Sequence, residues 1–341
     1  MSTALMDKHN LNDSSPSRHG WSARTSSKPL LAIVGADGFV GGGLSKRLAA
    51  EPSLRTASIV YGGATEQELR ISRAAPLLAD ADIILNCGGF RVRPGCSYRD
   101  YQNSHQGSTA AFVPYIRKDA LLIQISSASV LGKGHGLGNQ SAPNPMTFPS
   151  PEYALAKLEQ EQYLESVSLE RGFRVIFLRP AVLYSADGAG MVSTIIGLTR
   201  RGISPRLYPR SCRQHLAHMD LLADVVRRVI RRDDLPNLTR LVVADPYTVT
   251  NHELEEIIRS YQKMAGLPLP LPAHWMSRIL CSTFGSGKSW LDFKTRGQIL
   301  GVVAADIVYD PSDTYRLLEI DSSRYTIDQT LLRVIMEALK Q

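Results

Sequence analysis

Short apolar runs alternate with amphipathic stretches from residue 29 onward. Runs of four or five mostly apolar residues are typical of strands that are buried on both faces of a parallel sheet. We therefore predict five strands, at residues 30–34, 57–61, 83–86, 121–125 and 175–178. The stretches between and after them have helical periodicity and predict helices at 42–50, 65–78, 108–117 and 153–170. This alternation predicts an α/β fold in which a doubly wound parallel sheet is covered by helices.

A glycine-rich turn follows the first predicted strand. Gly35, Gly38 and Gly41 lie three residues apart, with Phe39 and Val40 between the last two, directly before the first predicted helix. Glycines in a strand-turn-helix setting let the backbone approach a pyrophosphate, which then lies at the positive end of the helix. We interpret this turn as the phosphate-binding element of a Rossmann-type dinucleotide site. Tyr61, Gly62 and Gly63 follow the second strand without an acidic residue or an arginine, so the choice between NAD and NADP stays open.

A tyrosine and a lysine lie four residues apart at the start of the longest predicted helix. Tyr153 and Lys157 therefore share one helix face. The pKa of a free tyrosine is about 10, so acid/base work near neutral pH requires a lower pKa, which a nearby lysine charge favours in a partly dry site. Ser127 follows the fourth strand at the edge where open α/β sheets bind ligands. We predict that Ser127 orients a substrate oxygen, that Tyr153 exchanges a proton with it and that Lys157 lowers the tyrosine pKa.

Taken together, these residues resemble the extended short-chain dehydrogenase/reductases, the group that includes nucleotide-sugar epimerases, dehydratases and reductases. Ser127, Tyr153 and Lys157 look like the catalytic trio of that family, and residues 35–41 look like its glycine motif. The resemblance implies that Lys157 also holds the nicotinamide ribose. It further implies that Asn103 opens a helix near the site and that Pro180 lies beside the nicotinamide.

Other positions bear on the substrate and the reaction. His218, Asp220 and Asp245 are similar to the substrate-lobe elements of the family, whereas Leu131 and Val182 stand where members that bind nucleotide sugars often carry Tyr and Asn. Sugar-nucleotide 4,6-dehydratases of the family carry an Asp-Glu pair directly after the residue that matches Ser127. Ala128 and Ser129 occupy those positions here, which predicts hydride chemistry without dehydration.

The regular alternation weakens after about residue 190. Proline-rich residues 267–273 and Gly/Ser-rich residues 284–289 predict loops, whereas Thr65 with Glu68 and Thr250 with Glu253 have the spacing of capping boxes. We expect three parts along the chain: a disordered N-terminal tail at 1–28, a dinucleotide-binding Rossmann domain at 29–185, and a smaller C-terminal substrate lobe at 186–341 that is interleaved with the sheet.

Charge and composition restrict the partners. The net charge is +7, but the basic residues 227–232 have the pattern of a solvated helix face, and we expect no nucleic-acid partner. The arginines upstream of them, at 200, 201, 206, 210 and 213, could instead attract an anionic substrate or cofactor. No run approaches the roughly 18 apolar residues of a membrane-spanning helix. The four cysteines lie far apart, which favours reduced thiols in a cytoplasmic protein. His215 and His218 have no third ligand spaced for a metal, so we expect no metal site.

The sequence therefore predicts an NAD(P)-dependent enzyme that acts on a hydroxyl or carbonyl carbon of a small-molecule substrate. A nucleotide-sugar epimerase or reductase is the leading interpretation, and reduction of a non-sugar carbonyl compound is the alternative. A cofactor-binding regulator without turnover is disfavoured because Ser127, Tyr153 and Lys157 are all present. Substrate identity, reaction direction and assembly as a homodimer stay open.

Overall fold

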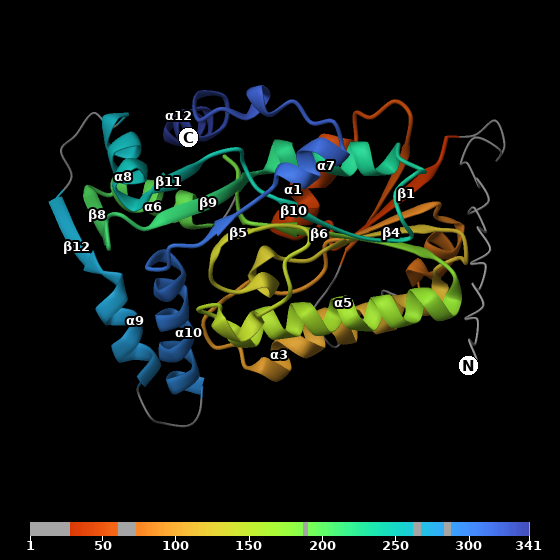
Figure 1. Cartoon of the computed structure of the whole chain (residues 1–341), viewed down its shortest axis with the longest axis horizontal. Coiled ribbons are helices and arrows are strands. Elements are labelled where there is room, and N and C mark those ends of the chain that lie inside the picture. Colours follow the sequence, from red (N-terminus) through yellow and green to blue (C-terminus); the bar gives the residue numbers. More distant parts are fainter. Residues whose placement is uncertain (1–27, 61–72, 187–189, 262–266, 283–287, 341) are drawn as a thin grey trace, which may run out of the picture.

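The computed structural model describes residues 28–60, 73–186, 190–261, 267–282 and 288–340. Six parallel strands form its central sheet in the order β10-β6-β4-β3-β1-β2. Their bounds are β1 Leu30–Val34, β2 Arg55–Ile59, β3 Ile83–Asn86, β4 Leu121–Ile125, β6 Arg174–Pro180 and β10 Leu238–Val243. Helices pack on both faces of this sheet (Figure 1), so the predicted doubly wound parallel sheet is confirmed.

The five predicted strands are all present, with small shifts at their ends. The second begins at Arg55 and ends at Ile59 instead of spanning 57–61, because it lies at the edge of the sheet and is paired only along β1 among the described strands. The sixth strand, β10, was not predicted. Arg240 interrupts its apolar run, and the side chain reaches Glu165 at 2.6 Å while its guanidinium lies 5.6 Å from the Phe177 ring centre.

Two layers of helices cover the sheet (Figure 1). On one face, α1 (Phe39–Leu48) and α7 (Met219–Ile230) bury their apolar sides against alternate residues of β1, β3 and β4. On the other face, α4 (Ser108–Phe112) and α5 (Pro151–Arg171) do the same against the remaining residues of these strands. Because both faces are covered, β1, β3 and β4 are buried at every position, as their sequences predict.

Two predicted helices differ from the observed ones. The first begins at Phe39 rather than at residue 42, because the last glycines of the turn already have helical backbone and Gly42 N donates to Gly38 O at 2.8 Å. The helix predicted at 108–117 ends at Phe112 and passes into a 3₁₀ turn at Val113–Tyr115. It is preceded by α3 (Tyr98–Gln102) and by a π-helical turn at Asn103–Gly107. A capping box of Ser97 and Asp100, whose spacing is visible in the sequence, opens α3. The part of the helix predicted at 65–78 that the structure describes is helical from residue 73 to 80.

The smaller lobe is built from small sheets and helices, mostly after residue 186 but with β5 and β7 contributed from before it. Its elements are β5 His135–Leu137, β7 Val182–Tyr184, α6 Met191–Arg200, β8 Ile203–Tyr208, β9 Arg213–His218, β11 Thr248–Thr250, α8 Asn251–Ser260, β12 Leu267–Pro272, α9 Ala273–Ser282, α10 Lys288–Val303, β13 Val308–Tyr309, α11 Ser312–Leu317 and α12 Arg333–Lys340. The strands pair as β11-β9-β7, β12-β8 and β13-β5. The chain is interleaved, because β10 and α7 follow β9 in sequence yet pack in the central sheet and its helix layer.

One loop prediction in this lobe was wrong. Residues Leu267–Pro272 form strand β12, which pairs in parallel with β8. Alternate N–H groups of a strand point to the same edge, so prolines at 268, 270 and 272 leave intact the N–H groups that face the other edge. The run is therefore compatible with an edge strand. The capping box of Thr250 and Glu253 is confirmed at the start of α8, whereas residues 1–27, the pair Thr65 and Glu68, and most of 284–289 lie outside the described residues.

In the described parts of the chain, no helix is both long enough and apolar enough to cross a membrane.

Candidate active site

The glycine turn joins β1 to α1 at the carboxyl edge of the sheet. Gly35 has a φ of +77°, and its N–H donates to Ile59 O at the end of β2, at 2.9 Å. A Cβ at Gly41 would lie 2.0 Å from Gly35 O, so only glycine allows this close approach of helix and turn. Gly38 is exposed and is the N-cap of α1, and as a glycine it has no side chain to cap this helix end. The first N–H groups of α1, at Phe39 and Val40, are therefore available to an anion.

Ser127 and Tyr153 meet beyond the end of β4. Ser127 is the N-cap of the 3₁₀ turn Ala128–Leu131, where its hydroxyl accepts from Ser129 N at 3.2 Å. Pro151 opens α5 and places Tyr153 in the first turn of that helix. Burial raises the pKa of Tyr153 to about 12, and the nearby side chain of Ser127 opposes that rise. The structure therefore brings these two predicted residues together.

Lys157 lies one turn further along α5 and is buried. Its Nζ donates to Ile125 O at 3.1 Å and to Gln160 Oε1 at 3.3 Å. Burial lowers the pKa of Lys157 to about 8, against the attraction of Cys87 and Glu161. The ammonium is thus directed to the end of β4. The expected lowering of the Tyr153 pKa by Lys157 is not found, because burial raises that pKa and the opposing effect comes from Ser127 instead of Lys157.

Buried amide side chains form hydrogen bonds at the carboxyl edge of the sheet next to Lys157. Asn86 at the end of β3 donates to Gln124 Oε1 of β4 at 2.7 Å and accepts from Gly88 N at 3.0 Å. Gln160 of α5 donates to Thr109 Oγ1 at 2.7 Å. These bonds tie the loop after β3, the end of β4 and two helices together around Lys157.

A buried ion pair lies beside them. Glu161 and Arg179 approach to 2.6 Å with side chains that are 1% exposed, and Ser126 Oγ donates to Glu161 at 2.5 Å. Arg179 directly precedes Pro180, which is buried at the end of β6 and pairs with Val243. The pair therefore fixes the end of β6 relative to α5.

Asn103 begins the π-helical turn that follows α3, and the residue of this turn that packs on Tyr153 is His105. Asn103 is exposed, whereas His105 is fully buried with its ring centre 5.6 Å from that of Tyr153 and 6.3 Å from that of Tyr101. Neither ring nitrogen of His105 has a hydrogen-bond partner within the described residues. Burial and the charge of Lys157 lower the pKa of His105 well below its usual value, so the ring is neutral. Sequence reasoning missed His105, although its four-residue spacing from Tyr101 is that of a shared helix face.

Gly89 makes room for this histidine. Its φ is +127°, and a Cβ there would lie 2.2 Å from His105 Nδ1. The loop after β3 therefore packs directly on the imidazole, close to the candidate acid/base residue.

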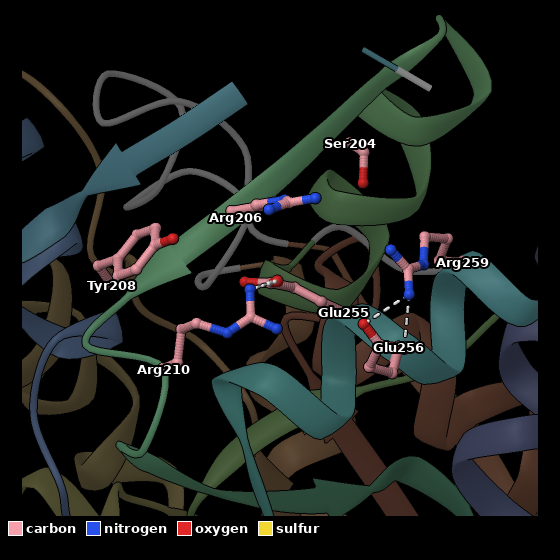
Figure 2. A pocket seen from close by; sticks show the side chains of 7 residues that line it. All are labelled: Ser204, Arg206, Tyr208, Arg210, Glu255, Glu256 and Arg259. Atoms are coloured by element: carbon pink, nitrogen blue, oxygen red, sulfur yellow. Dashed lines mark hydrogen bonds and ion pairs between the residues drawn. The ribbon is translucent and has the colours of Figure 1, made fainter. Parts of the chain in front are cut away.

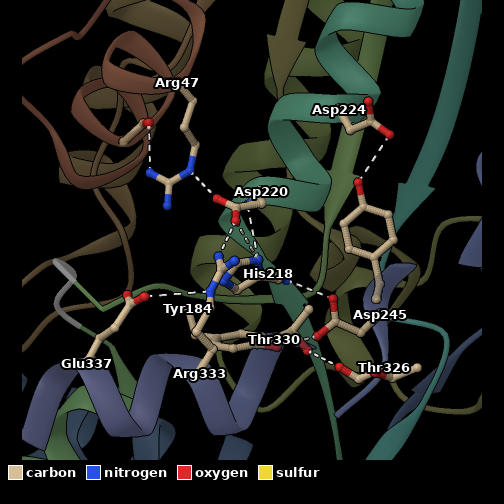
Figure 3. A network of polar contacts seen from close by, with 12 residues as sticks. Arg47, Tyr184, His218, Asp220, Asp224, Asp245, Thr326, Thr330, Arg333 and Glu337 are labelled. Carbon is tan, nitrogen blue, oxygen red and sulfur yellow. Dashed lines mark hydrogen bonds and ion pairs between the residues drawn. The ribbon is translucent and has the colours of Figure 1, made fainter. Parts of the chain in front are cut away.

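A second buried polar cluster lies where β9 meets α7 (Figure 3). Asp245 accepts from His218 N at 2.9 Å and from the Tyr184 hydroxyl at 2.8 Å, and burial raises its pKa to about 7. His218 Nδ1 accepts from Asp220 N, and His215 binds the Asp245 carbonyl and Tyr309 N. Both histidines thus have structural partners. The described part of the chain contains no group of three or more His, Cys, Asp or Glu side chains arranged to hold a metal ion.

The arginines of β8 and the loop after it line a pocket of about 280 Å³ next to α8 (Figure 2). Arg210 pairs with Glu255 at 3.1 Å, and Arg259 pairs with Glu256 at 2.7 Å. Arg213 pairs instead with Asp306 at 3.0 Å. Much of the positive charge in this region is therefore balanced by neighbouring carboxylates.

Comparison with known proteins finds a family model, a sequence relative and solved structures that are similar to this chain. The model of the family described as "NAD dependent epimerase/dehydratase family" matches residues 31–232. UDP-glucose 4-epimerase of Vibrio cholerae is 22% identical over 272 residues, which cover 75% of this chain and 82% of that protein. The structure of UDP-glucuronic acid 4-epimerase from Bacillus cereus in complex with NAD superposes with a TM-score of 0.68 at 14% identity, covering 92% of this chain and 97% of that one.

A further solved structure, that of RMD from Pseudomonas aeruginosa complexed with NADPH, gives a TM-score of 0.68 at 13% identity, covering 92% of this chain and 100% of that chain. At such identities the similarity concerns the fold, and it confirms the Rossmann-type architecture.

Proposed function

The chain belongs to the NAD dependent epimerase/dehydratase family, and on that premise we propose that it is an NAD(P)-dependent enzyme acting on a nucleotide sugar. The observation that carries the proposal is the meeting of Ser127, Tyr153 and Lys157 at the carboxyl edge of the sheet, where the glycine turn also ends. A purely structural protein has no need to bury a lysine there. The two epimerases named above support epimerisation at a sugar hydroxyl as the leading reaction.

The residues around the turn fit a dinucleotide. Gly35, Gly38 and Gly41 would admit the pyrophosphate, and the N–H groups of Phe39 and Val40 at the uncapped start of α1 would bind it. We assign to Lys157 the nicotinamide ribose, and to Asn103 and Pro180 places beside the cofactor, as the family resemblance implies. When bound, the nicotinamide would accept and return a hydride at the reacting carbon.

The proton chemistry falls to the chain itself. With a pKa raised to about 12, Tyr153 holds its proton at pH 7, which suits donation to a carbonyl oxygen. Oxidation of a sugar hydroxyl, the first half of an epimerisation, would require the reverse transfer, in which the ionised phenol takes the hydroxyl proton. Ser127, which lies near the same phenol, would orient that oxygen. Lys157, with a pKa of about 8, is mostly charged at pH 7 and stabilises negative charge that develops nearby.

The substrate class is tested with UDP-glucose, UDP-glucuronic acid and UDP-N-acetylglucosamine. Each is incubated with the protein and NAD or NADPH, followed by nuclear magnetic resonance and cofactor absorbance. An isomer of unchanged mass supports epimerisation, whereas stoichiometric NADPH oxidation supports the reductase. If no sugar reacts and a non-sugar carbonyl compound does, the alternative holds. Leu131, which is buried in an apolar cluster where nucleotide-sugar enzymes often carry Tyr, is the residue that favours it.

We also infer from the four free cysteines that the enzyme works in the cytoplasm, where thiols stay reduced.

A further inference from the structure

A pocket of about 590 Å³ lies outside the site described above, between the α1/α7 layer and the C-terminal segment. Four arginines from four separate elements line it: Arg47 of α1, Arg227 of α7, Arg324 of the turn Ser322–Tyr325 and Arg333 of α12. Arg47 lies nine residues beyond Gly38, which is about 13 Å along the helix. The pocket is therefore separate from the pyrophosphate-binding end of α1.

Arginines outnumber carboxylates in the lining of this pocket. Two carboxylates also line it, Asp220 and Asp224, so four guanidinium groups face two carboxylates. Asp220 lies between Arg47 and Arg333 and pairs with both (Figure 3). Asp224 accepts from the Tyr325 hydroxyl at 3.1 Å. Carboxylates beyond the lining pair with two of the arginines as well, because Arg227 contacts Glu51 at 3.6 Å and Arg333 contacts Glu337 at 3.7 Å. Among the described residues, Arg324 is therefore the lining arginine without an ion pair and the cation left to attract an anion.

Arg324 is the most available of these cations. It is exposed, and its guanidinium has no ion pair or hydrogen bond with another residue that the structure describes. Its backbone is nevertheless held in place, because Asp321 caps the turn at Ser323 N at 3.0 Å and the neighbouring Tyr325 is anchored to Asp224. The backbone at Arg324 is therefore fixed, and its guanidinium is able to turn toward an anion in the pocket.

The floor of the pocket is polar and neutral. Burial lowers the pKa of His218 to about 4, so its ring is uncharged at pH 7. The buried Thr330 hydroxyl donates to Thr326 O at 2.8 Å and contacts the Tyr247 hydroxyl at 2.6 Å. The lining residues are mostly polar or charged. The volume of the pocket is within the range of small-molecule binding sites.

We propose that this pocket binds a small phosphate-bearing anion, either inorganic phosphate or a phosphomonoester. A guanidinium group can donate two parallel hydrogen bonds to two oxygens of a phosphate, whereas a chloride ion is a single atom and cannot accept such a pair. The ligand would join α1 and α7 of the nucleotide-binding half to α12, whose Val334 and Ile335 are buried in the core of the C-terminal lobe. Binding would therefore stabilise the position of the lobe relative to the sheet.

Calorimetry on the full chain tests this proposal, with inorganic phosphate and glycerol 3-phosphate as probes and sodium chloride at matched ionic strength as the reference. We expect saturable binding of at least one probe. Arg324→Ala should weaken it at least about tenfold, since hydrogen bonds to charged groups contribute that much. Arg324→Lys should weaken it less. Arg316→Ala is the matched control, because Arg316 is exposed outside the pocket and pairs with Asp313.

Each remaining outcome is decisive. Tighter binding of glycerol 3-phosphate identifies a phosphomonoester as the ligand class, and tighter binding of inorganic phosphate identifies the free anion. Heat that does not saturate, or affinity that is equal in Arg324→Ala and Arg316→Ala, overturns the proposal. Displacement of the bound probe by NAD would also overturn it, because the anion would then occupy the glycine turn.

Discussion

Tyr153 and Lys157 lie one turn apart on α5, yet they bind different parts of the chain. The phenol of Tyr153 lies near enough to Ser127 for that side chain to lower its pKa, whereas the ammonium of Lys157 donates to the carbonyl of Ile125 at 3.1 Å. One helix face therefore contacts both the last residue of β4 and the turn that follows it. This relationship places a proton donor and a cation at one edge of the sheet, as the proposed chemistry requires.

Replacing Tyr153 with Phe should remove the proton donor and leave the ring packing on His105 and Tyr101 intact. We expect turnover of the nucleotide sugar to fall at least about 10²-fold, the usual effect of losing a general acid or base. Dinucleotide affinity, measured by calorimetry, should change little. Turnover equal to that of the wild type would show that another group exchanges the proton.

Replacing Gly38 with Val should block the approach of a pyrophosphate. The glycine is exposed, its φ is −79°, and an added Cβ would lie 3.3 Å from Gly35 O, so the fold should tolerate the change far better than at Gly41. We expect NAD and NADP binding to be lost in calorimetry while the far-ultraviolet circular dichroism spectrum is retained. Gly197→Ala in α6, where a Cβ meets nothing within 4 Å, is the control and should bind as the wild type does.

How much the sequence reveals depends on the physical origin of each element. Buried parallel strands such as β1 and β4 were predictable because burial on both faces requires a continuous apolar run. Strand β10 was missed because Arg240 snorkels out of the sheet to Glu165. Strand β12 was missed because alternate prolines are compatible with a strand only at an edge, and edges are set by the tertiary fold.

The candidate site shows the same division. The glycine turn and the four-residue spacing of Tyr153 and Lys157 are local, so the sequence indicates them directly. The position of His105 depends on a π-helical turn and on Gly89, which is sixteen residues away in the chain. The direction of the Lys157 ammonium depends on a carbonyl of β4, and no local pattern predicts that.

Replacing His105 with Leu should not destabilise the ligand-free protein in the way a core substitution normally does. The imidazole has two buried nitrogens without partners in the described part of the chain, and each such group costs about 1 to 3 kcal/mol. We expect the free energy of unfolding in urea to be unchanged or higher. His105→Ala is the contrasting variant and should lose stability through the cavity it leaves. A large loss for His105→Leu would indicate that the nitrogens have a hydrogen-bonding partner such as ordered water.

Asp245 should make stability depend on pH. Burial raises the pKa of its carboxyl to about 7, whereas the pKa in an unfolded chain is about 4. The folded state therefore binds this proton more tightly, and the stabilisation is complete below about pH 4 and is lost as the pH rises through 7. We therefore compare the free energy of unfolding of the wild type with that of Asp245→Asn. The wild-type value minus the variant value should fall by more than about 1 kcal/mol from pH 4 to pH 8.

The lowered pKa of His218 gives stability the opposite pH dependence. This contribution is present in both the wild type and Asp245→Asn, so it largely cancels in the difference between their free energies of unfolding. The lowered histidine pKa makes the folded state gain stability as the pH rises from about 4 to 6.5. A difference that stays flat from pH 4 to pH 8 would mean that Asp245 is ionised in the folded state throughout, with a pKa near that of an exposed carboxyl.

The reaction should proceed without loss of water, and the turn after Ser127 is the reason. Expelling a hydroxyl requires one group to protonate it and another to take a carbon-bound proton. Ala128 and Ser129 follow Ser127 here; both are buried in the 3₁₀ turn, and neither side chain titrates near neutral pH. Mass spectrometry of the products from UDP-glucose should therefore show the mass of the substrate or a change of two hydrogens. A product lighter by one water would contradict this prediction. The double variant Ala128→Asp with Ser129→Glu provides a comparison, because a product lighter by water from that variant alone would show that these two positions separate the two reactions.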